Sequence, residues 1–181
     1  MASFGGSVAR RYARAIFDIG VAKGLYEAFA TELDDLAAIY AGAPELREAL
    51  ENPVFTKPER RAVLEKILPR VAPSREVRTF ALLLLDRGRI GNLPLIARVY
   101  RELVDEKLGR VRATVTSATP LDPATQTAVQ RALERRTGKR VIVTASTDPD
   151  LIGGIVARVG DLVFDGSLKT RLETLKSRLQ N

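Results

Sequence analysis

The chain contains no cysteine and no histidine among its 181 residues. Without cysteine it can form neither a disulfide framework nor a thiolate metal site. Without histidine it lacks the usual general base, the commonest zinc ligand and the side chain that titrates near neutral pH. Carboxylates, lysine or serine can still support catalysis, so these absences make an enzyme less expected without excluding one.

Long hydrophobic runs are also missing. No window reaches the roughly 18 consecutive apolar residues that a bilayer-spanning helix needs. The first six residues lack the charged-then-apolar layout of a signal peptide, and Asp18 interrupts the arginine-rich segment that follows. The apolar share of 45% is ordinary for a folded globular protein. We therefore expect a soluble cytoplasmic protein.

Positive charge is abundant and unevenly distributed. The formal net charge is +7. Residues 1–109 hold 17 basic and 15 acidic side chains, whereas residues 110–181 hold 12 and 7. A basic C-terminal part can meet nucleic acid, an anionic lipid surface or an acidic protein, although a solvated surface is the ordinary explanation of such an imbalance.

Apolar residues recur at helical spacing through residues 7–109 and predict six short helices. Gly20 and Gly24 mark the end region of the first helix, and residues 56–59 have the form of a capping box for the fourth. The fifth helix contains Leu82–Leu85, is apolar on most of its circumference, and should be central or lie beside a partner's helix. The first helical stripe consists of Val8, Tyr12, Ala15, Ile16 and Ile19.

After Gly109 the periodicity changes from helical to alternating. Residues 110–116 alternate basic or hydroxyl side chains with Val111, Ala113 and Val115, which predicts a strand with one wet face. Asp122-Pro123 then begins a helix, and residues 141–145 form a second alternating strand. We predict two domains: an all-α six-helix bundle over residues 1–109 and a small α+β domain over residues 110–181.

Residues 153–167 carry the densest turn signals in the chain. Two strand-like pieces, residues 155–159 and 162–164, flank a Gly160-Asp161 turn, which predicts a hairpin. A turn at residues 165–167 then opens a last helix with a leucine seam formed by Leu168, Leu172, Leu175 and Leu179. The stretch holds no nucleophile paired with a base, so we interpret it as a folding device.

Three stretches of the chain together resemble the delta subunit of F-type ATP synthases, the family of the oligomycin-sensitivity-conferring protein. They are residues 8–18, residues 88–93, and residues 148–175 with their glycine turns in the family's order. Chain length and the helical-then-α+β layout agree, so the resemblance covers the whole chain. Ala157 is one departure, because the family pattern prefers a larger aliphatic residue there.

The resemblance implies a non-catalytic peripheral-stalk (stator) subunit without cofactor or metal. It implies that the helical domain binds the N-terminal helices of alpha subunits on the catalytic head, and that the second domain binds the b subunits of the stalk. The chain would then be a monomer within a hetero-oligomer, peripheral at the cytoplasmic face of the bacterial cell membrane, with no membrane insertion. It would bind no nucleic acid.

The resemblance also implies candidate binding residues. For the alpha-subunit helix they lie in a groove between the first and fifth helices: Tyr12, Ala15, Ile16, Phe80, Leu83 and Leu84. For the b subunits they lie at the C-terminus: Arg171, Lys176, Arg178 and Leu179. Apolar stripes are more often core, and charged runs are more often solvated surface, so both alternatives stay open.

Other functions have less support in the residues. The basic C-terminal half suggests an RNA-binding module, although Phe164 is its one aromatic residue for base stacking. Gly153-Gly154 could cradle phosphate, but no lysine or serine follows at P-loop spacing. Asp161 and Asp165 could be a catalytic carboxylate pair, but both lie in predicted turns, where aspartate commonly bonds its own backbone.

Overall fold

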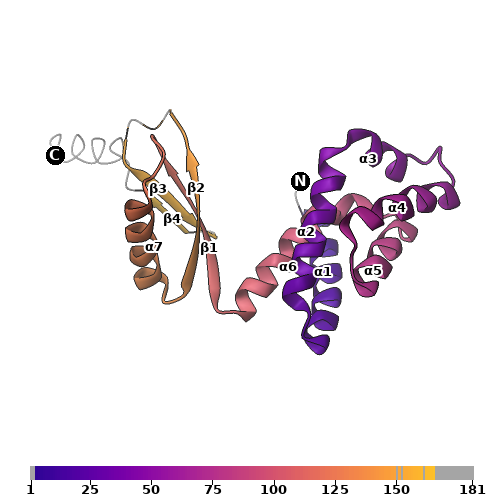
Figure 1. Cartoon of the computed structure of the whole chain (residues 1–181), viewed down its shortest axis with the longest axis horizontal. Helices are drawn as coiled ribbons and strands as arrows, with labels where there is room; N and C mark the ends of the chain where they lie inside the picture. The colour runs from indigo at the N-terminus through magenta and orange to yellow at the C-terminus, as the bar shows by residue number, and fades with distance from the viewer. Residues whose placement is uncertain (1–2, 150, 152, 161, 166–181) are drawn as a thin grey trace. The chain divides into compact units, whose positions relative to one another are not determined.

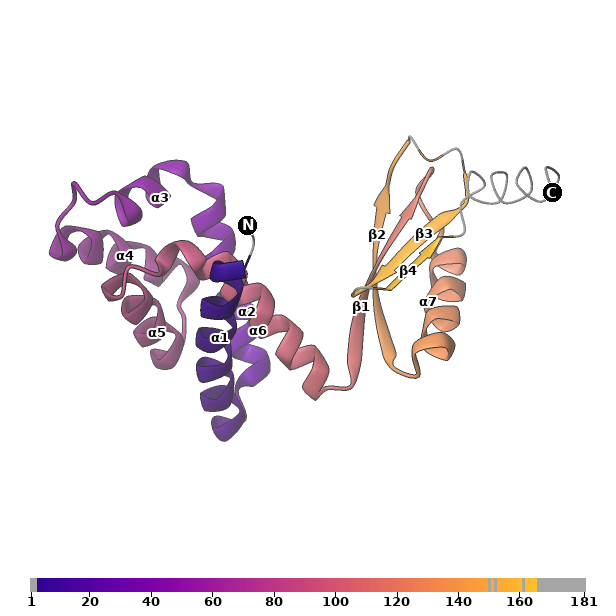
Figure 2. The same ribbon diagram turned by 180° about the vertical axis from the view of Figure 1, so that it is seen from behind.

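The computed structural model describes residues 3–149, 151, 153–160 and 162–165. Contacts divide the chain into two compact units, Met1–Val104 and Asp105–Asn181. The first is helical, and the second contains a small mixed four-stranded sheet (Figures 1 and 2). The helices of the described part are α1 (Ser3–Lys23), α2 (Tyr26–Gly42), α3 (Pro44–Glu51), α4 (Lys57–Val71), α5 (Arg75–Asp86), α6 (Leu93–Lys107) and α7 (Pro123–Thr137).

Local signals set most helix ends as expected. Thr56 accepts a hydrogen bond from the backbone N–H of Glu59, whose carboxylate accepts one from the Thr56 N–H, so the predicted capping box is present at α4. Asp122 caps α7 by accepting from the Thr125 N–H at 2.9 Å. Helix α4 does not stop at Pro69 but continues to Val71. A short 3-10 helix, η1 (Ile90–Asn92), precedes α6.

The core of the helical unit depends on the close packing of α1 against Tyr100 of α6. Its buried face consists of Ala9, Ala13, Ile16, Phe17 and Gly20. The predicted stripe is therefore only partly core, because Ala15 and Ile19 are exposed. Gly20 does not end the helix. A Cβ there would lie 2.7 Å from the hydroxyl oxygen of Tyr100, so this position requires glycine for space, and the left-handed Gly24 (φ +69°) follows the helix end.

The second unit is a sheet with α7 along one face. Its strands are β1 (Arg110–Ser117), β2 (Arg140–Thr147), β3 (Ile155–Val159) and β4 (Leu162–Asp165), in the order β2-β1-β3-β4. Strands β1 and β2 are parallel and joined through α7, whereas β3 is antiparallel to both β1 and β4. The hairpin predicted around Gly160 is confirmed, with Val159 opposite Leu162.

Small and aliphatic side chains fill the core between α7 and the sheet. The buried members are Ala113, Val115, Leu133, Val141, Ala157 and Val159. Ala157, where the family pattern prefers a larger residue, is 4% exposed and stands opposite the half-buried Phe164. The predicted alternation in β1 is confirmed, because Ala113 and Val115 are buried while Arg112 and Thr114 are exposed.

An ion-paired corner joins the last turn of α6 to β1. The carboxylate of Asp105, a nearly buried residue, accepts hydrogen bonds from Nε of Arg110 and Nε of Arg112, both at 2.6 Å. Gly109 takes a left-handed conformation (φ +62°) between the helix and the strand. The corner therefore satisfies a buried acid with two cations of the neighbouring strand.

Gly20→Ala is expected to lower the free energy of unfolding by about 1–3 kcal/mol, because overpacking against Tyr100 and the Tyr26 backbone outweighs the better helix propensity of alanine. The control is Gly42→Ala, where the new methyl would meet nothing within 4 Å. Urea unfolding followed by circular dichroism measures both variants. Equal stability of the two would contradict the close-packing account.

Asp105→Ala is expected to destabilise the second unit by about 1–3 kcal/mol, because it removes the acceptor shared by Arg110 and Arg112. Glu102→Ala removes the exposed Arg98–Glu102 pair from the same helix and should change stability by less than about 0.5 kcal/mol. Hydrogen exchange of the β1 and β2 amides reports the difference. A larger loss of protection in the Glu102 variant would refute this ranking.

Candidate functional site

Helix α5 is held at its N-terminus by a side chain of α2. The Oε2 atom of Glu32 accepts hydrogen bonds from the Ser74 N–H at 2.9 Å and from the Ser74 hydroxyl at 2.7 Å. The Ser74 Oγ atom in turn accepts from the Val77 N–H at 3.4 Å. The Ser74 side chain therefore caps α5, and the Glu32 carboxylate of α2 satisfies the start of the helix from outside.

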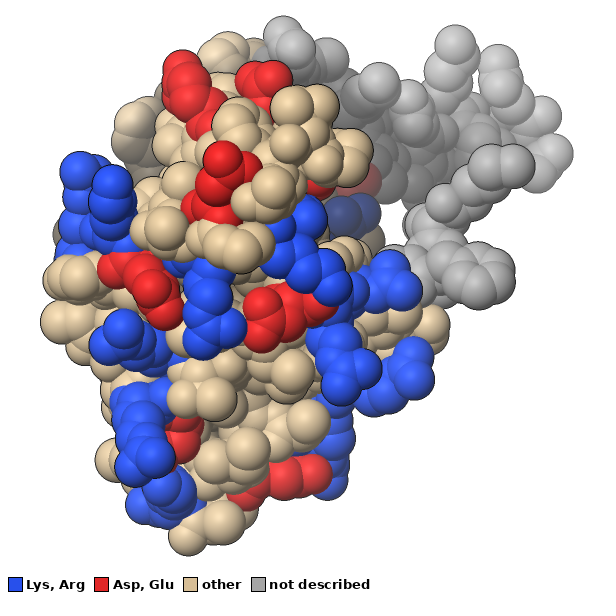
Figure 3. Space-filling model, turned by 90° about the vertical axis from the view of Figure 1, so that its right-hand side faces the viewer, with Lys and Arg blue, Asp and Glu red and all other residues tan. Residues whose placement is uncertain are grey.

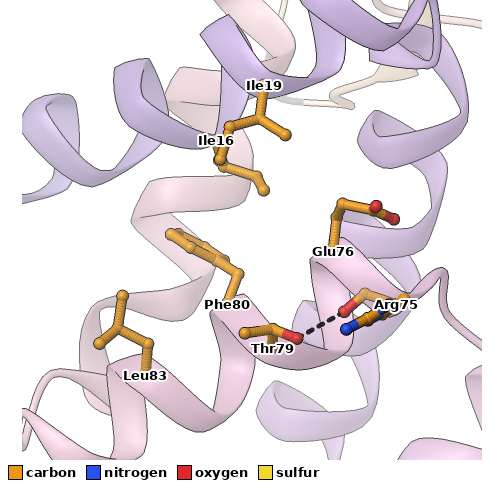
Figure 4. Close-up of a pocket in the computed structure, with 7 residues that line it drawn as sticks. All are labelled: Ile16, Ile19, Arg75, Glu76, Thr79, Phe80 and Leu83. Atoms are coloured by element: carbon orange, nitrogen blue, oxygen red, sulfur yellow. Dashed lines mark hydrogen bonds between the residues drawn. The ribbon is translucent and has the colours of Figure 1, made fainter.

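An open pocket of about 320 Å³ lies between α1 and α5 (Figure 4). Helix α1 contributes two isoleucines, and α5 contributes one face of its first three turns. The lining residues are Ile16, Ile19, Arg75, Glu76, Thr79, Phe80 and Leu83.

The apolar residues of the pocket divide into a buried floor and an exposed rim. Ile16 and Phe80 are 2% and 7% exposed, and they form the floor. Ile19 and Leu83 remain 44% and 41% exposed. The ring of Tyr12 meets that of Phe80 edge-on, with centroids 6.3 Å apart. Two large aliphatic side chains are thus left in water beside a preformed apolar surface, which is typical of a recognition site.

The polar end of the pocket is an ion pair. Lys23, in the last turn of α1, donates to the carboxylate of Glu76 on α5. This hydrogen bond is the main cause that holds the pKa of Glu76 below its ordinary value. The carboxylate therefore stays ionised near neutral pH, which suits charge pairing and not general-acid catalysis. The Thr79 hydroxyl is occupied, because it donates to the backbone oxygen of Arg75 at 2.8 Å.

The structure brings together only some of the residues predicted for the groove. Ile16, Phe80 and Leu83 line the pocket, and Tyr12 adjoins it. Ala15 is exposed on α1 and is absent from the lining. Leu84 is fully buried in the core of the helical unit, so its inclusion in a surface site is corrected. Successive residues of an α-helix are rotated by about 100° around the helix axis. Leu84 therefore faces the core, whereas Leu83 faces the pocket.

Four lining residues were not among those predicted for the groove: Ile19, Arg75, Glu76 and Thr79. Helical spacing could have found most of them. Ile19 follows Ile16 by three positions, and Glu76, Thr79 and Leu83 share one face of α5. The prediction followed apolar character alone, and that criterion both omitted the polar members and admitted Leu84.

The candidate stalk-binding residues Arg171, Lys176, Arg178 and Leu179, the leucine seam and Asp161 lie outside the described residues. Gly153 and Gly154 have φ values of 136° and 85° and lead into β3, not into a helix N-terminus. They therefore lack the aligned helix dipole that phosphate cradles commonly use. The described part of the chain has no group of three or more acidic side chains that could hold a metal ion.

Charged side chains cover much of one face of the helical unit. Figure 3 shows Lys and Arg predominating on the face that it presents, with Asp and Glu between them. Helix α4 carries five basic residues, Lys57, Arg60, Arg61, Lys66 and Arg70, against two acidic ones, Glu59 and Glu65. Within the described residues, no helix combines the length and the apolar character required to cross a membrane.

Comparisons with known proteins agree over almost the whole chain. The model of the family "ATP synthase delta (OSCP) subunit" matches residues 8–179. The protein named ATP synthase subunit delta from Anaeromyxobacter sp. (strain Fw109-5) is 45% identical over 175 residues, covering 97% of this chain and 98% of the relative. Its namesake from Syntrophus aciditrophicus (strain SB) is 44% identical over 172 residues, covering 95% of each.

A solved structure shares the fold. A chain of the Toxoplasma gondii mitochondrial ATP synthase hexamer superimposes with a TM-score of 0.69 at 23% identity, over 96% of this chain and 97% of that one. The order of a helical unit and a small mixed sheet is therefore common to both. From the family match over residues 8–179 and the near full-length relatives, we conclude that this chain belongs to the ATP synthase delta (OSCP) subunit family.

Proposed function

We propose that this chain is the non-catalytic stator subunit that links the catalytic head of an F-type ATP synthase to its peripheral stalk. In this proposal the helical unit binds the N-terminal helices of alpha subunits, and the second unit binds the b subunits. The proposal also puts the chain at the cytoplasmic face of the bacterial cell membrane, as a peripheral protein. Family membership supports the stator role, and the exposed Leu83 beside a preformed apolar floor supports the first contact.

The pocket has the features of a groove for an amphipathic helix. Ile16 and Phe80 supply a buried apolar floor, and the exposed Ile19 and Leu83 can contact an inserted side chain from the rim. Each large aliphatic anchor that becomes fully buried contributes about 1.5–3 kcal/mol. Two or three such anchors at helical spacing, less the cost of ordering, are sufficient for binding in the micromolar range.

The chemistry of the pocket fits binding better than catalysis. Its one carboxylate, Glu76, is paired with Lys23, and its one hydroxyl, Thr79, is bonded to the helix backbone. Neither group is left as an activated nucleophile or base. The RNA-binding alternative gains no support from the family match or from the relatives. A protein-binding role is the function that the residues and the family together favour.

Leu83→Glu is expected to weaken binding of a peptide from the N-terminus of the organism's own alpha subunit at least tenfold, because a carboxylate would have to be desolvated against Phe80. The melting temperature should change by no more than about 2 °C, because Leu83 is already 41% exposed. Isothermal titration calorimetry and thermal circular dichroism measure the two effects.

The matched control is Phe55→Glu, which places the same charge at a 40% exposed apolar position in the segment between α3 and α4. This variant should bind the peptide as the wild type does. Leu84→Glu, in contrast, should unfold the helical unit, because it buries a charge at a fully covered position. Equal peptide affinity for the wild type and Leu83→Glu would move the alpha-subunit site away from this pocket.

A further inference from the structure

Glu76 is the acidic side chain among the residues that line the pocket between α1 and α5. It lies in the first turn of α5, and Figure 4 shows it extending toward α1. Its side chain is only 22% exposed, so the carboxylate is largely removed from water beside the apolar walls. A first-turn acid can stabilise a helix from an exposed position. Helix stability alone therefore does not account for the place of this carboxylate in the pocket.

The Glu76 carboxylate can accept more hydrogen bonds than it receives from its own chain. An ionised carboxylate has about four lone-pair sites. The Lys23 ammonium and the backbone N–H of Glu76 itself are the donors that hold the pKa of this carboxyl below its ordinary value. Capacity remains for a donor that enters the pocket. Such a bond is stronger than one between neutral groups, because the acceptor is charged.

Thr79 adds a second acceptor to the same wall of the pocket. It follows Glu76 by three positions, so the two side chains lie one turn apart on one face of α5. The hydrogen of the Thr79 hydroxyl is already donated to the backbone oxygen of Arg75. Its oxygen can therefore only accept from an incoming group. The wall thus offers two acceptors beside the apolar floor formed by Ile16 and Phe80.

The charges at this end of the pocket balance one another. Lys23 donates to Glu76, and Arg75 lies close enough to act on the same carboxyl through its charge. A second acid, Glu32, holds Ser74 at the start of α5. Two cations thus stand against two acids, so excess charge attracts neither a cation nor an anion. A charged incoming group would also have to lose its hydration, whereas an uncharged donor meets the acceptors at a lower cost.

We propose that Glu76, together with Thr79, is the polar recognition point of the pocket, and that it accepts a hydrogen bond from an uncharged donor beside the apolar anchors of the bound alpha-subunit helix. The donor is a side-chain hydroxyl or amide, or an N–H of the first turn of that helix, where N–H groups lack partners within the helix. The inference rests on the proposed function, because it takes an alpha-subunit helix as the occupant. Glu76 then fixes the register of binding, since apolar anchors that repeat with each turn would permit a shift along the groove.

Glu76→Leu separates this role from a purely apolar recognition. The variant removes the acceptor and adds apolar surface, so a groove that recognises apolar side chains alone would bind the helix more tightly. We expect the opposite: the peptide from the N-terminus of the organism's own alpha subunit should bind at least about fivefold more weakly in isothermal titration calorimetry. Tighter binding would overturn the proposal.

Two variants control for folding and for net charge. Glu45→Leu makes the same change in the exposed first turn of α3 and should leave the peptide affinity unchanged. Glu76→Gln keeps one acceptor oxygen without the charge, and its affinity should lie between those of the wild type and Glu76→Leu. It also keeps the proposal testable if the leucine variant does not fold, which circular dichroism reports. Equal losses in Glu45→Leu and Glu76→Leu would overturn the proposal.

A charge swap separates recognition by Glu76 from a role in holding the two helices together. K23E/E76K preserves an ion pair between α1 and α5 but places an ammonium donor where the wild type has an acceptor. We expect this variant to bind the peptide no better than Glu76→Leu does. Restored wild-type affinity would show that the pair acts only as a link between the helices, which contradicts the proposal.

Changes in the peptide identify the donor. Its hydroxyl and amide side chains are replaced by alanine one at a time, and the backbone N–H groups of its first turn are replaced by ester oxygens. One replacement should weaken binding to the wild type at least about fivefold and binding to Glu76→Leu by about twofold or less, which is the signature of a direct contact. The class of that replacement tells whether a side chain or the helix terminus donates. Equal losses in both proteins at every position would overturn the proposal.

Failure of this inference is distinguishable from failure of the proposed function. A wild-type chain that does not bind the alpha-subunit peptide would refute both. A loss of binding in Leu83→Glu, with wild-type affinity in Glu76→Leu and in Glu76→Gln, would leave the peptide in this pocket and refute the role of Glu76 alone.

Discussion

The close approach of α1 to the centre of the helical unit is the constraint on which the pocket depends. Gly20 allows it, since the hydroxyl of Tyr100 occupies the space that any Cβ would need. Ala9 and Ala13 are fully buried along the same face, and Phe17 meets Tyr100 edge-on with ring centroids 5.8 Å apart. This packing fixes the rotation of α1 about its axis, and Ile16 and Ile19 therefore face α5.

In the second unit, the alternation of side chains along β1 imposes a corresponding constraint on which residues are buried. Each buried residue of β1, such as Ala113 or Val115, is followed by one on the opposite face. Because α7 takes one face, the arginines and threonines of β1 must lie on the other. The pocket is thus what local packing leaves uncovered between α1 and α5, whereas the period of β1 decides which of its side chains face α7.

The sequence predicted elements well where a local pattern determines them. The capping box at Thr56, the aspartate cap at Asp122 and the hairpin at Gly160 are each decided by neighbouring residues. The pocket was predicted less completely, because it depends on the rotation of α1 and α5 about their axes. In a run of four leucines, spacing alone cannot tell that Leu83 is exposed and Leu84 is buried. The rotation of α5 is set by the packing of Phe80 and Ala81 in the core. The role of Gly20 was missed for the same reason, since Tyr100 is eighty residues away in the chain.

A stator subunit has to hold two partners at once, and the chain connection between the units bears on that task. The division between them falls at Val104, inside α6 and not in a glycine- or serine-rich linker. The last turn of α6 is then bonded to β1 through Asp105. The chain therefore passes from the first unit to the second through helix backbone, and the ion pairs of Asp105 belong to the second unit. In the proposed function neither binding site needs exceptional affinity, because each partner, once bound, raises the effective concentration of the other in the assembled complex. Under the proposed function, two moderate sites can hold the head against rotation longer than either could alone.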